Sequence, residues 1–161
     1  MTTVATLLRL YRDAGWRIAT AESCTAGLLS AALTDEPGSS DVFERGFVTY
    51  SDAAKTEMLG VPPATLAAHG AVSEAVARDM AQGALLRSGA DVAVSISGIA
   101  GPGGSEHKPE GRVCFGLACR GAATRVQTVE FGPLGRRNVR QASVDHALEM
   151  LLSALPPADQ P

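Results

Sequence analysis

The sequence predicts an α/β fold, built as a single layered domain with a mixed β-sheet flanked by helices. Three observations predict it. Segments with helical spacing of apolar residues alternate with short strand-like segments through the first hundred residues. A hairpin pattern follows at 112–131, so antiparallel strands join the parallel ones. The 161 residues are 45% hydrophobic, which suits one core. We assign 1–161 to one domain, with a core over about 7–155 and a frayed tail at 156–161.

In the first half of the chain, turn and cap residues mark the ends of the expected elements. Gly15 ends a helix over 4–14, and Gly60 ends a helix over 53–59 that Ser51 or Asp52 caps. Between them we expect a strand over 16–20, a helix over 28–33, a turn at 37–40 and a strand over 43–50.

The second half is predicted in the same way. A short helical piece over 62–69 precedes a helix over 74–87, which Ser73 caps. The clearest strand is 91–97, and the glycine-rich segment 98–111 after it is expected to be a long loop, of a length that is usually functional or disordered. A hairpin of strands 112–119 and 125–131 leads into a long helix over 136–155.

Composition argues against several classes of function. A net charge of -3 and a pI near 5.6 disfavour nucleic acid as the main ligand. The odd set of cysteines, Cys24, Cys114 and Cys119, contains no CxxC pair, and no spacing favours a metal site. No signal peptide or membrane-spanning apolar run is visible, so we expect a soluble, cytoplasmic protein without a membrane partner.

Ser23 lies where an expected strand turns into an expected helix. At that position the backbone N–H groups of Thr25, Ala26 and Gly27 could hold an oxyanion or a phosphate at the positive end of the helix. A simpler interpretation is that Ser23 is only a helix N-cap. The local pattern alone favours that simpler interpretation, because serine is common at N-caps.

A serine nucleophile needs a base. None of the three histidines has local support, and no Gly-x-Ser-x-Gly elbow surrounds Ser23. A lysine can serve if burial lowers its pKa, and only Lys55 and Lys108 exist. Lys55 falls in the first turn of an expected helix, whose positive end disfavours an ammonium group. On composition alone, an ordinary solvated lysine is the better interpretation.

Two further segments could bind substrate. The run from Ser97 to Gly104 leaves a strand end, and its glycines would let backbone approach a ligand closely. Arg136, Arg137 and Arg140 cluster at the start of the last helix and could bind a phosphate through paired hydrogen bonds. The alternative for the arginines is a solvated basic helix end.

Taken together, these segments resemble the family of CinA C-terminal domains, the nicotinamide-nucleotide amidases called PncC. The resemblance extends from about residue 7 to 155. The matching runs are AESCT (21–25), RGFVTYS (45–51) with Lys55, LGV (59–61), GAVS (70–73), GIAGP (98–102) with Lys108, Pro109 and Gly111, and Arg136 with Arg140.

The resemblance implies hydrolysis of the carboxamide of nicotinamide mononucleotide to nicotinic acid mononucleotide and ammonia, without metal or cofactor. By position it makes Ser23 the nucleophile and Lys55 its base, with Tyr50 assisting. Backbone donors after Ser23 would stabilise the oxyanion. The expected substrate-binding residues are Thr25, Ala26, Gly27, Ser97, Gly98, Gly101, Arg136 and Arg140.

This sequence departs from the family pattern at three places. Ala26 stands where glycine is usual, and Ser97 replaces a frequent threonine. The loop after Pro102 is one residue shorter than usual, with Glu110 where valine is common. We expect the stand-alone form of the domain, with Cys24 as a packed small residue.

A second hypothesis is a non-catalytic nucleotide- or partner-binding module of the competence/damage-inducible type. The joint presence of Ser23, Tyr50 and Lys55 favours the enzyme. The family also suggests self-association, so we expect a homo-oligomer, and a dimer first of all.

Overall fold

The structure is a computed structural model that describes residues 3–105 and 107–155. The expected frayed tail, 156–161, lies outside the described residues. Five strands form one sheet in the order β2-β1-β3-β4-β5. They are β1 (Ile18–Glu22), β2 (Phe43–Val48), β3 (Val92–Gly98), β4 (Arg112–Cys119) and β5 (Arg125–Glu130). β1, β2 and β3 are mutually parallel. β4 pairs with β3 in the antiparallel direction, and β5 pairs with β4 in the same way. The predicted mixed sheet is confirmed.

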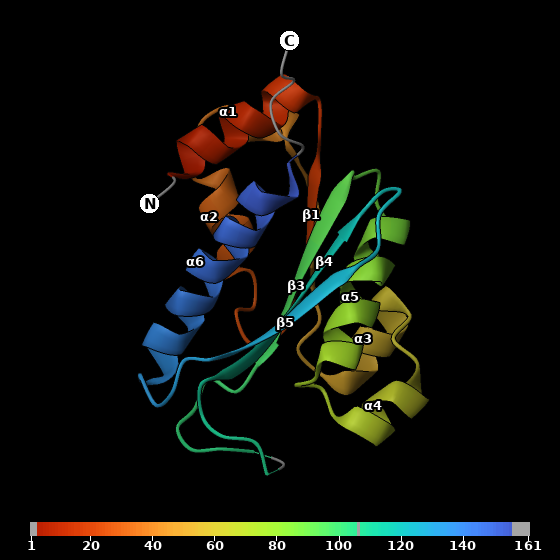
Figure 1. The fold of residues 1–161 in the computed structure, drawn as a ribbon, viewed down its shortest axis with the longest axis vertical. Coiled ribbons are helices and arrows are strands. Elements are labelled where there is room, and N and C mark those ends of the chain that lie inside the picture. Colours follow the sequence, from red (N-terminus) through yellow and green to blue (C-terminus); the bar gives the residue numbers. More distant parts are fainter. Residues whose placement is uncertain (1–2, 106, 156–161) are drawn as a thin grey trace.

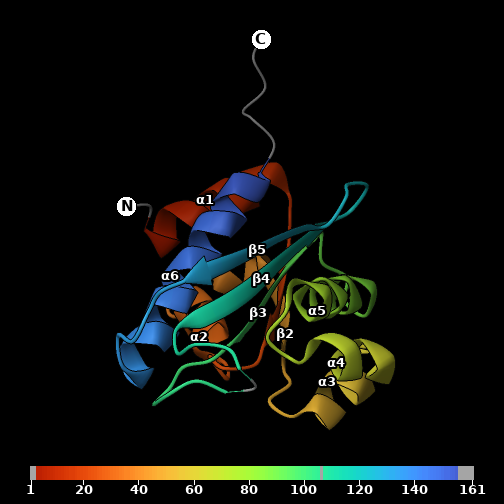
Figure 2. The same cartoon turned by 60° about the horizontal axis from the view of Figure 1, so that its bottom comes forward.

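Helices cover both faces of the sheet, which confirms the α/β prediction (Figures 1 and 2). One face carries α1, α2 and α6, and the other carries α3, α4 and α5. Their bounds are α1 (Val4–Ala14), α2 (Leu28–Thr34), α3 (Asp52–Leu59), α4 (Pro63–His69), α5 (Glu74–Leu86) and α6 (Arg136–Ala154), with a short 3-10 turn at Ser39–Asp41. Each face buries its own apolar cluster, so β1 and β3 are buried on both sides.

Capping residues explain why the predicted helix boundaries fall within two residues of the observed ones. Gly15 and Gly60 end α1 and α3 in the left-handed conformation, and the Ser51 and Ser73 hydroxyls accept hydrogen bonds from the first turns of α3 and α5. The prediction for β1 was wrong by two residues, because the strand covers 18–22 rather than 16–20. Glu22 continues the buried strand because four hydrogen bonds satisfy its carboxylate.

A close contact between two helices fixes the position of α3. At Gly83 of α5, an added Cβ would lie 2.0 Å from the carbonyl oxygen of Leu59 in α3, so no larger residue fits. Because α3 also carries Lys55, this contact helps to place that lysine against the end of β1.

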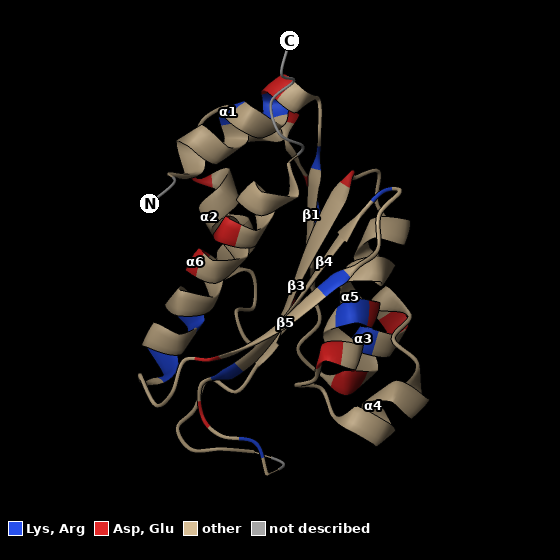
Figure 3. Cartoon of the chain, in the orientation of Figure 1, with Lys and Arg blue, Asp and Glu red and all other residues tan. Residues whose placement is uncertain are grey.

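Within the described ranges, no helix has the length and apolar character needed to cross a membrane. Acidic and basic residues are distributed along the helices, strands and loops, and basic residues gather in the first turns of α6 (Figure 3).

Candidate active site

The loop after β3 and the start of α6 lie near the carboxyl ends of β1 and β3 (Figures 1 and 2). The residues at these ends line a two-part cleft. Ligands of open α/β sheets bind at such ends. The inner cavity, of about 220 Å³, is lined by Ser23, Cys24, Tyr50, Asp52, Lys55, Ala71, Val72, Ser97, Gly98, Ala100 and Arg136. The outer cavity, of about 350 Å³, shares Tyr50, Ala71, Val72, Gly98, Ala100 and Arg136, and adds Ile99 and residues 101–105.

Ser23 and Lys55 meet in the inner cavity. Lys55 Nζ lies 3.0 Å from Ser23 Oγ and donates to the Tyr50 carbonyl oxygen at 3.1 Å. The lysine is 1% exposed, so the interpretation of a solvated lysine is wrong. The N-cap interpretation of Ser23 is also wrong, because Gly27 is the N-cap of α2. A nucleophile and a base within hydrogen-bond distance form the basic unit of covalent catalysis.

The pKa of Lys55 is lowered from its usual value. Burial is the main cause, because it disfavours the charged ammonium. The negative charge of Asp52, on the first residue of α3, acts in the opposite direction and raises that pKa, as does Cys24 to a smaller degree. A neutral lysine can accept a proton, which an ammonium cannot.

Glu22 holds the turn that carries Ser23. Its fully buried carboxylate accepts hydrogen bonds from the Thr25 hydroxyl at 2.6 Å, the Leu29 N–H at 2.9 Å, and the Ser30 hydroxyl and N–H at 2.7 and 3.1 Å. The positive end of α2 therefore binds a carboxylate of the protein, whereas the sequence predicts that it could hold a substrate anion. The Thr25 hydroxyl donates to the Glu22 carboxylate, and Thr25 does not line either cavity.

The backbone donors of the turn differ from those predicted. The N–H of Ala26 donates to the Ser23 carbonyl oxygen at 3.1 Å, so the prediction that it stabilises an oxyanion is wrong. Gly27 has a free N–H among the described residues but does not line the cleft. Cys24 does line it, and its N–H has no oxygen acceptor in the described part of the chain.

Ala26 adopts a left-handed conformation, with φ of 47°. That conformation costs a residue with a side chain about 1–2 kcal/mol relative to the right-handed region. The strain explains why glycine would suit this position better, as the family pattern indicates.

Arg140 supports the same turn from α6. Its Nε donates to the Cys24 carbonyl oxygen at 3.0 Å, and Nη2 lies 3.5 Å from that of Thr25. The guanidinium is half-buried and does not line either cavity. The structure therefore gives Arg140 a positioning role in place of the predicted contact with substrate.

The neighbouring thiol is poorly suited to be a nucleophile. Burial raises the pKa of Cys24 to about 11, against smaller lowering effects of the backbone N–H groups of Cys24 and Gly98. At neutral pH the group is therefore a thiol rather than the reactive thiolate. Cys24 is 7% exposed and belongs to the apolar cluster under α1, α2 and α6, as expected for a packed residue.

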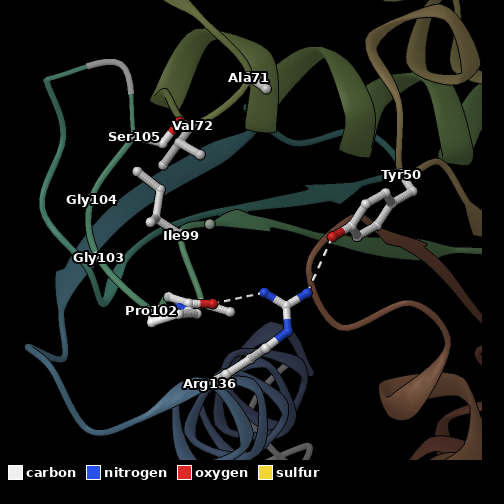
Figure 4. Close-up of a pocket in the computed structure, with 12 residues that line it drawn as sticks. Tyr50, Ala71, Val72, Ile99, Pro102, Gly103, Gly104, Ser105 and Arg136 are labelled. Carbon is white, nitrogen blue, oxygen red and sulfur yellow. Dashed lines mark hydrogen bonds between the residues drawn. The ribbon is translucent and has the colours of Figure 1, made fainter.

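Tyr50 and Arg136 line both cavities, and their side chains point toward each other (Figure 4). Arg136 donates to the Gly101 carbonyl oxygen at 2.8 Å and to the Tyr50 hydroxyl at 3.2 Å. The Tyr50 hydroxyl thus contacts Arg136, whereas its carbonyl contacts Lys55. Gly101 has φ of 92°, a conformation that residues with side chains rarely adopt, and an added Cβ would also force the Glu110 carboxylate to move.

Ser97 and Gly98, the last two residues of β3, border the cleft. The Ser97 hydroxyl donates to the Ala71 carbonyl oxygen at 2.7 Å, which ties β3 to the segment before α5. A Cβ on Gly98 would lie 2.6 Å from a methyl group of Val113 in β4, so glycine is needed for this packing. Both residues line the inner cavity, as the sequence predicted.

Sequence reasoning missed three residues of this site. The sequence assigns no role to Glu22, indicates Asp52 only as a possible helix cap, and offers Lys108 only as a possible base and as part of a run that matches the family pattern, whereas in the structure Glu22 holds the turn, Asp52 lines the inner cavity and Lys108 binds the Val72 carbonyl oxygen. A carboxylate directly before a strand-to-helix turn was the available signal for Glu22. In residues 3–105 and 107–155, no group of three or more His, Cys, Asp or Glu side chains is placed to hold a metal ion.

Comparison with known proteins gives a consistent result. A family model described as the CinA C-terminal domain matches residues 1–155. A CinA-like protein of Akkermansia muciniphila is 55% identical over 139 residues, which are 86% of this chain and 33% of that protein. The chain thus spans about a third of the length of such curated relatives.

Two solved structures resemble almost the whole chain. The competence/damage inducible protein CihA from Agrobacterium tumefaciens has a TM-score of 0.90 at 46% identity, over 93% of this chain and 92% of that one. The competence damage-inducible protein A from Klebsiella pneumoniae has a TM-score of 0.91 at 38% identity, over 98% and 100%. The chain therefore belongs to the family of CinA C-terminal domains.

Proposed function

We propose that this chain is an amidase that hydrolyses nicotinamide mononucleotide to nicotinic acid mononucleotide and ammonia. The observation that carries the proposal is the buried contact of 3.0 Å between Lys55 Nζ and Ser23 Oγ at the floor of a cleft. Such a pair can form an acyl-enzyme without a histidine. The resemblance of the sequence to nicotinamide-nucleotide amidases supplies the substrate.

The first half of the reaction forms the acyl-enzyme. Neutral Lys55 takes the proton of Ser23 while Oγ attacks the carboxamide carbon. The oxyanion that forms is stabilised by backbone N–H groups, and the best placed is that of Cys24, because Cys24 lines the inner cavity beside Ser23. The Lys55 ammonium then gives its proton to the amide nitrogen, the C–N bond breaks, and ammonia leaves.

The second half regenerates the enzyme. Lys55, neutral again, takes a proton from a water molecule that attacks the acyl carbon. The ester bond to Ser23 breaks, and the protonated lysine returns a proton to Oγ. Burial lowers the pKa of Lys55 and so favours the neutral amine that both transfers require.

Each of the two cavities would bind a different part of the substrate. The inner cavity contains the reacting pair and would take the carboxamide and its ring. The outer cavity is lined by glycine-rich backbone and, among its described lining residues, by a single charged side chain, that of Arg136. Arg136 would therefore bind the phosphate.

The decisive test is turnover of nicotinamide mononucleotide by the purified protein, followed by ammonia release and by chromatography of the acid product. Ser23→Ala is expected to lower kcat by about a thousandfold or more. Cys24→Ala, the matched change at the adjacent cleft residue, is expected to keep most of the activity, because its thiol is protonated. Wild-type activity in Ser23→Ala would exclude Ser23 as the nucleophile.

Wild-type protein that binds the nucleotide without turnover would instead favour the binding module of the competence/damage-inducible type. We also propose, from the family resemblance, that the chain forms a homodimer. Sedimentation equilibrium of the purified chain tests that proposal separately.

The pH dependence of the reaction should depend on Asp52. Its negative charge raises the pKa of Lys55, so Asp52→Asn should lower that pKa further. Because the neutral lysine is the active form, the acidic limb of the kcat/KM profile should move to lower pH, by about 0.3–1 unit given the exposed position of Asp52.

Glu57→Gln is the matched control for Asp52→Asn, because it removes an exposed charge from the same helix. The control should leave the acidic limb in place. A shift of the Asp52→Asn profile to higher pH would contradict the assignment of Lys55 as the base.

A further inference from the structure

Three side-chain hydrogen bonds tie one wall of the cleft to β3 and to the loop after it. Lys108 Nζ donates to the carbonyl oxygens of His69 and Val72, both at 2.7 Å. Ser97 donates to the carbonyl oxygen of Ala71, also at 2.7 Å. The connection between α4 and α5 is thus held at three nearly consecutive carbonyl groups.

This connection borders the substrate cleft directly. Ala71 and Val72 line both cavities, and loop residues 99–105 line the outer cavity. Lys108 itself lines neither cavity. Its hydrogen bonds join the loop to the 69–72 segment, and both segments contribute lining residues, so Lys108 acts on the outer cavity only through the backbone it holds.

The loop is fixed at its other side as well. Arg136 donates to the Gly101 carbonyl oxygen at 2.8 Å, so α6 holds the loop near its beginning. Near its tip, Ser105 and Lys108 exchange backbone hydrogen bonds of 3.0 and 2.7 Å, which places the lysine on a tight turn. The glycine-rich stretch between these points has much conformational freedom to lose, so its shape depends on both attachments.

The chemistry of the contact suits a cation. Charge-assisted hydrogen bonds are stronger than neutral ones, and Lys108 is half-buried, so water screens it only in part. His69 is the last residue of α4, and its carbonyl oxygen is one of the groups left without an intrahelical partner at a helix end. A neutral side chain of similar length would leave both carbonyl oxygens without this donor.

We propose that Lys108 is a positioning residue that sets the width of the outer cavity and thereby selects for substrates that carry the ribose phosphate. The inference rests on the proposed function, because it assigns the nucleotide part of the substrate to that cavity. It predicts an effect on KM for the nucleotide and little effect on the chemical step at Ser23, which lies in the inner cavity.

The test compares wild type, Lys108→Met and Lys108→Arg with nicotinamide mononucleotide and with nicotinamide riboside, which lacks the phosphate. Lys108→Met should raise KM for the mononucleotide by about tenfold or more while kcat changes less than about threefold. Its preference for the mononucleotide over the riboside should fall by a similar factor. Lys108→Arg, which keeps a cationic donor, should recover most of the preference. The control is Arg78→Met, an exposed charge on α5 outside both cavities.

Amide hydrogen exchange provides a readout that does not need turnover. The N–H groups of Ser105 and Gly111, both hydrogen-bonded within the loop, should exchange at least about tenfold faster in Lys108→Met than in wild type. Unchanged exchange would overturn the proposal, and so would an equal loss of kcat on both substrates. A wild-type protein without amidase activity would refute the proposed function, and exchange would still decide whether Lys108 holds the loop.

Discussion

Replacing Lys55 by methionine is expected to abolish amide hydrolysis and, at the same time, to stabilise the fold. Without the base, kcat should fall by about 10⁴-fold, since a serine hydroxyl alone is a weak nucleophile. Methionine matches the length of the lysine stem and removes an amine that is 1% exposed. The free energy of unfolding near pH 7 should rise by about 1–2 kcal/mol.

The sign of the stability effect follows from the lowered pKa of Lys55. In the unfolded chain the pKa of a lysine is about 10.4. Between that pH and the lower pKa of Lys55 in the folded protein, the unfolded state binds more protons than the folded state. The free energy of unfolding of wild type therefore falls as the pH falls through this window, and it levels off below the folded pKa. Lys55→Met lacks this dependence, so its advantage should be absent near pH 10.5 and grow toward neutral pH.

Urea unfolding of both proteins at several pH values measures this difference. Ser23→Ala is a useful comparison, because it is also expected to be inactive but keeps the lysine and hence the pH dependence. Two acceptors oppose the gain, since Ser23 Oγ and the Tyr50 carbonyl lose the lysine as a partner. They line a cavity that water can enter, which limits that cost. A Lys55→Met protein that is less stable than wild type at pH 7 would show that the amine is a net structural element.

Local sequence signals predicted much of the fold but could not predict the contacts of the site. Gly15, Gly60, Ser51 and Ser73 mark helix ends through their own backbone or side-chain preferences, so those ends were predictable. The Ser23–Lys55 contact joins residues 32 positions apart and requires β1 and β2 to be parallel neighbours. Residue spacing alone favours a helix N-cap for Ser23 and an ordinary solvated lysine for Lys55, and only the family resemblance pairs the two residues.

Contacts between residues far apart in the sequence also explain why the roles of Arg140 and Lys108 could not be predicted. Arg140 reaches the Cys24 carbonyl oxygen across 116 positions, and Lys108 reaches Val72 across 36. Such contacts depend on how helices and loops settle on the sheet, and they leave no periodic signal in the sequence. Glu22 is different, because its partners lie within eight positions, so the sequence did contain the information. A carboxylate just before a helix start is a recognisable partner for the helix N–H groups.

Glu22→Gln should be among the most destabilising single changes at this site. All four hydrogen bonds to the carboxylate come from donors, so an amide NH₂ in place of one oxygen would face a donor rather than an acceptor. The change also removes the negative charge at the positive end of α2. We expect the free energy of unfolding to fall by about 2–4 kcal/mol. Glu130→Gln, which breaks an exposed pair with Arg112, should cost at most about 1 kcal/mol.

The effect on catalysis separates positioning from mere stability. Glu22 lies directly before Ser23, and its carbonyl oxygen accepts the Thr49 N–H at 2.9 Å, so it fixes the turn relative to β2 and the segment leading to Lys55. Assayed well below its unfolding temperature, Glu22→Gln should still show kcat lowered by about tenfold or more, with KM nearly unchanged. A folded Glu22→Gln protein with wild-type kcat would mean that Arg140 and the backbone contacts of the turn suffice to aim the nucleophile. Since Arg140 binds only carbonyl oxygens after Ser23, whereas Glu22 binds the helix that the turn must enter, we expect the carboxylate to be the stronger constraint.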